Sequence, residues 1–170
     1  MSQKLRVCTL NIWNYNDPWP TRRQLIADTI KEHTPDIIGF QEIRHSGTKN
    51  DNGKNQAQQL AQHLPDYTYI YRPAQQNPEK DEWEGLAIFS RLPIQNSSFI
   101  KLSMDPEDKR DNHQRIVLHA QIQTPNGSMN FFNTHLSLSQ QGRIRTTQEI
   151  TAYVNRYKGD LPSVLVGDFN

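Results

Sequence analysis

Residues 162–170 read PSVLVGDFN, and this stretch is the most informative one about the architecture. Val164, Leu165 and Val166 are consecutive large apolar residues, which is typical of a short strand buried on both faces. The polar residues Asp168 and Asn170 follow immediately. Because α/β folds place their sites at the rim where strands end, this pattern predicts a functional site at the end of the last strand.

Three other predicted strands also end in polar side chains. Taken singly, each such residue has a structural explanation, such as a loop cap or a solvated carboxylate. Taken together with Asp168 and Asn170, they supply the carboxylates, imidazole and amides of a metal-assisted hydrolytic centre. They are Asn11 in TLN, Glu42 in FQE, and Asn133 and His135 in FFNTH.

The donor atoms of this set favour a hard cation. Carboxylate and amide oxygens, without thiolates or paired histidines, suit magnesium, with manganese as the alternative, and disfavour zinc. Cys8 is the only cysteine, so an internal disulfide and a cysteine-based zinc site are both excluded. A hard cation held by one or two protein carboxylates usually also binds a phosphate oxygen. We therefore expect a phosphate ester as the substrate.

Short apolar runs alternate with helical patterns along the chain. The hairpin signal Asn126-Gly127 and two or three crossover helices fit two packed sheets better than one doubly wound parallel sheet. The expected fold class is therefore α/β (α+β), with helices outside two sheets. Strands are predicted over 5–12, 36–42, 66–74, 84–90, 94–103, 113–124, 128–136 and 162–167, and a charged loop over 75–84. Helices are predicted over 18–34, up to His63 and over 139–158, and the core-facing side of the first is formed by Leu25, Ile26, Thr29 and Ile30.

The composition limits the class of partner. Lys plus Arg is 19 and Asp plus Glu is 18, and the resulting net charge of +1 argues against sequence-independent DNA binding. A polyanionic substrate would have to be held by local arginines or a metal. No apolar stretch is long enough for a transmembrane segment, and the first residues lack the apolar core of a signal peptide. The cytoplasm is the default expectation, although prior removal of a signal peptide would leave the same sequence; the oligomeric state is not predicted.

Five motifs in order resemble the endonuclease/exonuclease/phosphatase superfamily, which includes pancreatic-type deoxyribonucleases, abasic-site endonucleases, neutral sphingomyelinases and inositol polyphosphate phosphatases. The resemblance implies a four-layer sandwich of two mixed β-sheets flanked by helices. It also implies magnesium-dependent hydrolysis of a phosphodiester or phosphomonoester by water attack at phosphorus. Trp13 stands where the abasic-site branch carries Asp, which argues against close kinship with that branch. The motifs are TLNIWN, FQEIR, EGLAIFSRLPI, NTHLSLS and GDFN.

The resemblance also assigns roles to the residues that match its motifs. Glu42 corresponds to the principal metal ligand and Asn11 to its neighbour. His135 corresponds to the histidine that hydrogen-bonds a phosphate oxygen. Asp168 corresponds to the carboxylate that orients or deprotonates the attacking water, and Asn170 to the amide that steadies the phosphoryl oxygens or the metal.

Four further residues complete the predicted site. The resemblance implies that Glu84 orients His135, while Arg44, Arg72 and Arg115 are candidates to grip a substrate phosphate, each with the alternative of an ordinary surface or ion-paired arginine. The substrate itself stays open between nucleic acid, a phospholipid headgroup and a sugar or inositol phosphate. The loops 44–55, 74–84 and 103–113 are expected to select among them.

Members of the superfamily continue past GDFN with further strands and an Asp-His pair. Residues 1–170 are therefore expected to form an incomplete domain of this type, with an exposed sheet edge and little or no hydrolase activity on their own. The alternative function, from a different class, is a non-catalytic module that keeps the sandwich and uses it to bind a partner.

Overall fold

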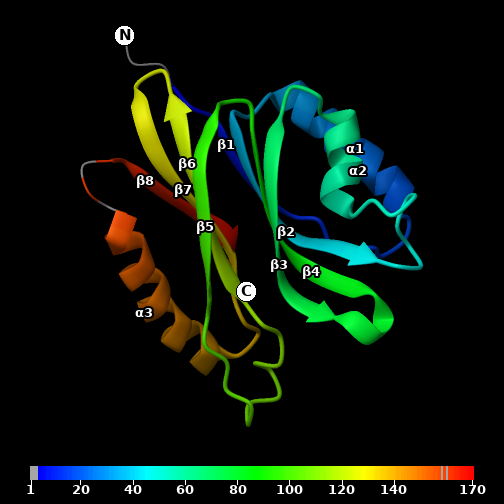
Figure 1. Ribbon diagram of the computed structural model, residues 1–170, viewed down its shortest axis with the longest axis vertical. Helices are drawn as coiled ribbons and strands as arrows, with labels where there is room; N and C mark the ends of the chain where they lie inside the picture. The colour runs from blue at the N-terminus through cyan, green and yellow to red at the C-terminus, as the bar shows by residue number, and fades with distance from the viewer. Residues whose placement is uncertain (1–3, 158, 160) are drawn as a thin grey trace.

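The computed structural model describes residues 4–157, 159 and 161–170. Strands and helices interleave along the chain, as the alternation of apolar runs and helical patterns predicts (Figure 1). The elements are β1 (Val7–Asn11), α1 (Trp19–His33), β2 (Ile37–Ser46), α2 (Gln56–His63), β3 (Thr68–Asn77), the 3₁₀-helix η1 (Pro78–Lys80), β4 (Glu82–Ser90), β5 (Ile94–Lys101), β6 (Ile116–Thr124), β7 (Gly127–His135), α3 (Gln140–Tyr157) and β8 (Ser163–Asp168).

The strands form two four-stranded sheets, in the orders β1-β2-β4-β3 and β5-β6-β7-β8. In each sheet one edge pair is parallel, β1 with β2 and β7 with β8, and the other neighbours are antiparallel. Both parallel pairs are joined through a helix, because parallel strands need a crossover connection. The predicted pair of mixed sheets is therefore confirmed.

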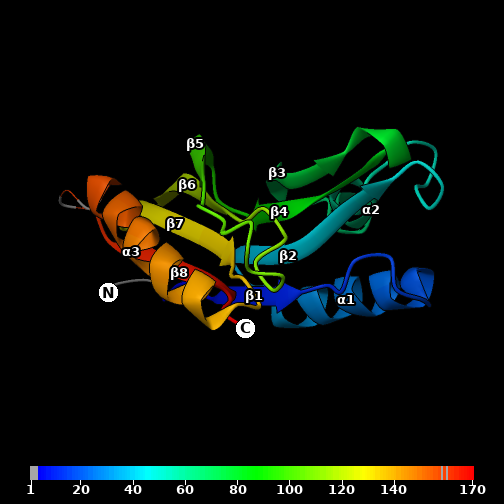
Figure 2. The same cartoon turned by 90° about the horizontal axis from the view of Figure 1, so that it is seen from below.

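The fold has four layers: the helices α1 and α2, the two sheets, and α3. Three apolar clusters fill the spaces between them. One cluster, around Phe40 and Phe89, lies between the first sheet and the helices α1 and α2. A second, around Ile88 and Phe131, fills the space between the sheets, and a third, around Phe132, lies under α3. Figure 2 shows the same order edge-on, with α1 and α3 at opposite ends. The predicted four-layer sandwich is confirmed.

Two details of the sequence-based prediction are wrong. Residues 75–84 are not a loop, because β3 continues to Asn77 and β4 begins at Glu82, with only η1 between them. Charged side chains are tolerated there because this end of the hairpin is only partly buried. On α1 the buried residues are Trp19, Ala27 and Ile30, whereas Leu25, predicted to face the core, is 65% exposed. Lys158, the last residue of the predicted third helix, lies outside the described residues.

The edge strands β1 and β8 meet on the same side of the sandwich (Figure 2). Val7, Leu10 and Leu165 on these strands are each more than a third exposed. An apolar groove of about 500 Å³ lies between β1 and α1, and Leu25 is one of the residues that line it. Among the described residues, no helix has both the length and the apolar character needed to span a membrane.

Candidate active site

The ends of β1, β7 and β8 and the bulge within β2 meet at one rim of the sandwich. Asn11, the last residue of β1, donates hydrogen bonds from Nδ2 to Glu42 Oε1 at 2.9 Å and to Asp168 Oδ2 at 2.8 Å. Asn14 Nδ2 donates to the other Glu42 oxygen at 3.1 Å. One amide group thus lies between two carboxylates that come from different sheets, so the two sheets contribute to a single site.

Glu42 reaches this position through an irregularity in β2. The register between β2 and β4 shifts between Phe40 and Ile43, and Glu42 has a φ of 57°, which is unusual for a residue other than glycine. Such a bulge redirects a side chain that the regular pleat would place elsewhere. Strained backbone at a sheet rim is a frequent feature of functional sites.

Buried amides beneath Glu42 hold the bulge in place. Asn133 of β7 donates to the carbonyl oxygens of Phe40 at 2.9 Å and Ala87 at 3.0 Å, and accepts from Gln41 Nε2 at 2.7 Å. Asn133 and Gln41 are almost completely buried. Since a buried polar group left without a partner is costly, these bonds fix the relative position of the two sheets below the site.

Asp168 and His135 are opposite each other in the parallel pair β7–β8. His135 Nε2 lies 3.8 Å from Asp168 Oδ2, and the backbone N–H of Asn170 donates to Asp168 Oδ1 at 3.0 Å. The preceding residue must be small, because a Cβ at Gly167 would lie 2.4 Å from the Thr134 carbonyl oxygen. Asn170 turns its side chain away from the carboxylates and donates to the Leu136 carbonyl at 2.8 Å.

The environment separates the protonation states of these two groups. Burial, reinforced by the positive charge of Arg115, lowers the pKa of His135 to about 4, against the opposing effect of Asp168 and Glu42. For Asp168, burial acts to raise the pKa, but the hydrogen bonds from Asn11 and Asn170 and the charge of nearby groups outweigh it and lower the pKa. Near neutral pH the pair is therefore a neutral imidazole beside a carboxylate.

Two arginines border the carboxylates. Arg44 pairs with Glu84 at 2.8 Å, and its Nε is buried without a hydrogen-bond partner. Arg115 is partly buried, its Nε is also buried without a partner, and burial lowers its pKa despite the nearby acidic groups. Among the described residues, the Arg115 guanidinium forms no ion pair or hydrogen bond. Nearby carboxylates, including those of Glu42 and Asp168, favour the charge of this guanidinium, but its N–H groups have no direct partner in the described part of the chain, so this position suits an anionic ligand.

A cleft of about 320 Å³ brings most of the predicted residues together. Glu84 lines it, but its ion pair is with Arg44, and the carboxylate that approaches His135 is Asp168. Arg72 does not line it and instead lies over the ring of Phe99, 5.5 Å from the ring centroid. The cleft is lined by Asn11, Asn14, Glu42, Arg44, Glu84, His113, Arg115, His135, Leu138, Asp168 and Asn170.

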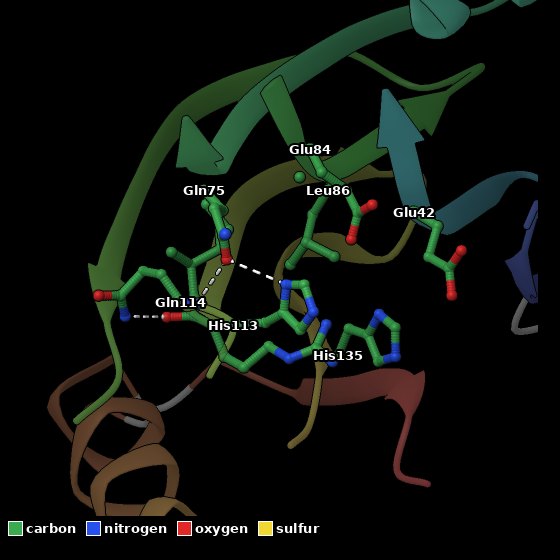
Figure 3. Close-up of a pocket in the computed structure, with 11 residues that line it drawn as sticks. Glu42, Gln75, Glu84, Leu86, His113, Gln114 and His135 are labelled. Atoms are coloured by element: carbon green, nitrogen blue, oxygen red, sulfur yellow. Dashed lines mark hydrogen bonds between the residues drawn. The ribbon is translucent and has the colours of Figure 1, made fainter. Parts of the chain in front are cut away.

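The sequence patterns do not reveal two of the polar cleft residues, Asn14 and His113. Asn14 follows β1 in a segment with positive φ at Trp13 and Asn14, and only this turn brings its amide back to Glu42. His113 lies in the predicted selector loop 103–113, and its Nδ1 is 3.1 Å from Gln75 Oε1 of β3 (Figure 3). Neither residue ends a strand, which was the signal used to find the others.

A model of the endonuclease/exonuclease/phosphatase family matches residues 8–170. The chain belongs to this family. An uncharacterised protein of Acanthamoeba polyphaga mimivirus is 25% identical over 163 residues, which cover 89% of this chain and 59% of that protein.

Solved structures of family members are also similar to this chain. A mannosyl-6-phosphatase from Bacteroides thetaiotaomicron has a TM-score of 0.78 at 26% identity, and the match covers 98% of this chain and 66% of the phosphatase. A family member from Bacteroides vulgatus has a TM-score of 0.77 at 25% identity, covering 99% of this chain and 67% of the other. The human Nocturnin catalytic domain, at 22% identity and a TM-score of 0.73, covering 98% and 64%, shares the fold. The chain spans less than two thirds of the length of the mimivirus protein and of the mannosyl-6-phosphatase.

The donor set of the cleft fits the hard cation that the family resemblance implies. Glu42 and Asp168 present carboxylate oxygens on either side of Asn11. Among the described residues, no group of three or more His, Cys, Asp or Glu side chains is arranged to hold a metal ion on its own. Magnesium usually keeps several waters and takes only one or two protein carboxylates together with substrate phosphate, so two carboxylates at one cleft suit it.

Proposed function

We propose that the family member to which these residues belong hydrolyses a phosphate ester by attack of water at phosphorus, with magnesium or manganese as cofactor. The observation that carries the proposal is the partly buried Arg115 guanidinium, which forms no direct ion pair or hydrogen bond among the described residues and lies in the same cleft as Asp168 and His135. A phosphate would supply hydrogen-bond acceptors for its N–H groups. A mannosyl-6-phosphatase of the same fold is 26% identical to this chain, which supports a phosphate ester as the class of substrate.

Each side chain of the cleft would have a separate role in such a reaction. Asp168, kept ionised by its hydrogen bonds, would orient the water and accept its proton. His135 stays neutral near pH 7 and would place an imidazole nitrogen against a phosphate oxygen. Arg115 and Arg44 line the cleft and would neutralise charge on the phosphoryl oxygens.

Glu42 and Asn11 would hold the cation, with Asp168 next to them. When bound, a divalent cation stabilises the negative charge that develops on the phosphoryl oxygens. In the structure Asn11 fixes both carboxylates in orientation and Asn14 fixes the second oxygen of Glu42. Asn170 would contact the substrate only after its amide leaves the Leu136 carbonyl, so we assign it to positioning Asp168 through its backbone N–H.

A panel assay tests the proposal. The full encoded protein and residues 1–170 are each incubated with plasmid DNA, oligonucleotides and small phosphate monoesters, with magnesium and with EDTA. We expect magnesium-dependent hydrolysis by the full protein and, as the family resemblance implies, little by residues 1–170. Absence of hydrolysis by the full protein on the whole panel would favour the alternative, a non-catalytic partner-binding module.

A further inference from the structure

A second groove lies beside the cleft, between β3 and β5. Its volume is about 530 Å³, larger than that of the cleft. Two cationic side chains line it, Arg72 from β3 and Lys101 from β5, and none of its described lining residues is acidic. The whole chain is nearly neutral, so this pair is a local concentration of positive charge. Such a groove favours an anionic ligand.

Arg72 is held ready for such a ligand. Its guanidinium carbon lies 5.5 Å from the centroid of the Phe99 ring, a cation–π arrangement that restricts the side chain while leaving its N–H groups free. Among the described residues, neither Arg72 nor Lys101 has an ion pair or a side-chain hydrogen bond. Phe99 and Met104 are 40% and 42% exposed in the same groove and offer apolar contact to a ring attached to the anion.

The groove adjoins the cleft through a small hollow. Gln75 and Gln114 line both the groove and this hollow, whose other walls include Glu42, Arg115 and His135 (Figure 3). Gln75 Oε1 accepts from the backbone N–H of Gln114 at 3.0 Å, which ties β3 to the segment before β6. Arg72 is three residues from Gln75 along β3, or about 10 Å at the rise of a strand.

We propose that the groove binds a second phosphate of the substrate, one that is not cleaved. This inference rests on the proposed function and narrows its substrate class to compounds with two or more phosphates. Arg72 offers a planar fork of donors that matches a phosphate, and Lys101 adds a point charge. The second phosphate comes either from the neighbouring nucleotide of an oligonucleotide or from a sugar or inositol bisphosphate.

Binding measurements test the inference without any need for turnover. Isothermal titration calorimetry on the full protein carrying Asp168→Asn compares three probes: inorganic phosphate and two compounds with two phosphates each, a single-stranded dinucleotide with a 5′-phosphate and a hexose bisphosphate. The groove variant is Arg72→Ala/Lys101→Ala. The control, Lys31→Ala/Arg156→Ala, also removes two exposed positive charges, but from the surfaces of α1 and α3.

We expect the groove variant to bind at least one two-phosphate probe with an affinity about tenfold or more below that of its parent, and to bind inorganic phosphate with unchanged affinity. The control variant should bind all three probes with the affinity of the parent. The probe that loses affinity identifies the source of the second phosphate. An equal loss for inorganic phosphate, no loss for either two-phosphate probe, or the same loss in the control would overturn the inference.

The two proposals fail separately. If the full wild-type protein hydrolyses small phosphate monoesters while the groove variant binds every probe as its parent does, the groove inference is wrong and the function stands. If the groove variant loses the two-phosphate probe but the wild type hydrolyses nothing, the proposed function is wrong and the groove remains an anion site.

Discussion

The carboxylates of Glu42 and Asp168, from different sheets of the sandwich, accept hydrogen bonds from a single nitrogen, Nδ2 of Asn11, at 2.9 and 2.8 Å. Two like charges close together repel, and the shared donor offsets that repulsion. The arrangement keeps two sets of carboxylate oxygens directed at the same small volume. Asn11 is therefore a positioning residue for both acidic groups.

Replacement of Asn11 tests this role. Asn11→Ala removes the shared donor, so we expect magnesium affinity, measured by calorimetry, to fall about 10- to 100-fold, as is usual when a group that orients a ligand is lost. The exposed Asn96 on β5 lies outside the cleft and supplies the control Asn96→Ala. Equal magnesium affinities for Asn11→Ala and the control would show that Asn11 does not organise the carboxylates.

Asn133 should contribute mainly to the stability of the fold beneath the cleft. Asn133→Ala leaves the Phe40 and Ala87 carbonyls and the Gln41 amide without their buried partner. We expect the free energy of unfolding to fall by at least about 2 kcal/mol in urea denaturation. Asn130→Ala serves as the control, because Asn130 is another buried amide of β7 and, in the part of the chain that the structure describes, has no hydrogen bond to β2. Magnesium affinity should fall for Asn133→Ala and stay unchanged for Asn130→Ala.

Much of the site could be predicted because Asn11, His135 and Asp168 end strands, and strand ends of packed sheets meet at a rim. Glu42 follows an apolar run in the same way, but the prediction that its strand ends there is wrong: β2 continues to Ser46, and Glu42 lies at the bulge within it. The partners of charged side chains could not be predicted, because they depend on register. Glu84 is opposite Arg44 across β2 and β4 only because of the bulge before Ile43.

The arginines show the same limit. Arg72 and Arg115 both lie near the ends of predicted strands, 66–74 and 113–124, and the sequence around them does not distinguish their roles. Arg115 enters the cleft because it immediately precedes β6, whereas Arg72 points toward β5 and Phe99. Asn14 was missed because a turn with left-handed backbone, rather than a strand, carries its amide to Glu42.

Arg115 should contribute more to phosphate affinity than to the stability of the fold. Arg115→Met keeps an apolar stem and removes a partly buried charge that has no direct ion pair among the described residues but is attracted by nearby carboxylates. These two effects oppose each other, so we expect the free energy of unfolding to change by no more than about 1 kcal/mol. Affinity for inorganic phosphate should fall about tenfold or more. Arg115→Lys keeps the charge but not the planar fork and should bind phosphate with intermediate affinity. A destabilised Arg115→Met variant with wild-type phosphate affinity would show that Arg115 has a structural partner instead.

His119 should make stability depend on pH. It is 2% exposed, its ring nitrogens lie 3.1 Å from Ser98 Oγ and 3.0 Å from Asn130 Oδ1, and burial lowers its pKa. The unfolded chain therefore binds a proton that the folded chain does not. The contribution of neutral His119 to the free energy of unfolding is fully present above the ordinary histidine pKa. It falls as the pH drops below about 6.5, by up to about 1.4 kcal/mol per pH unit.

Urea denaturation at pH 7.5 and pH 5.5 measures this effect. His119→Gln should be less stable than wild type at pH 7.5 and should lose less stability between the two pH values. His135 contributes to the same pH dependence, because its pKa is also lowered by burial, and the exposed His33 supplies the control His33→Gln. If His119→Gln keeps the full pH dependence of the wild type, the proton is taken up elsewhere.

The most direct test of the account is hydrolysis of the best phosphate ester from the panel by the full protein and its Asp168→Asn variant, at saturating magnesium. Asp168→Asn keeps the shape of the side chain but removes the proton acceptor, so the account predicts that kcat falls by about a hundredfold or more with the fold intact. Equal rates for the wild type and Asp168→Asn would contradict the assignment of the reaction to this cleft.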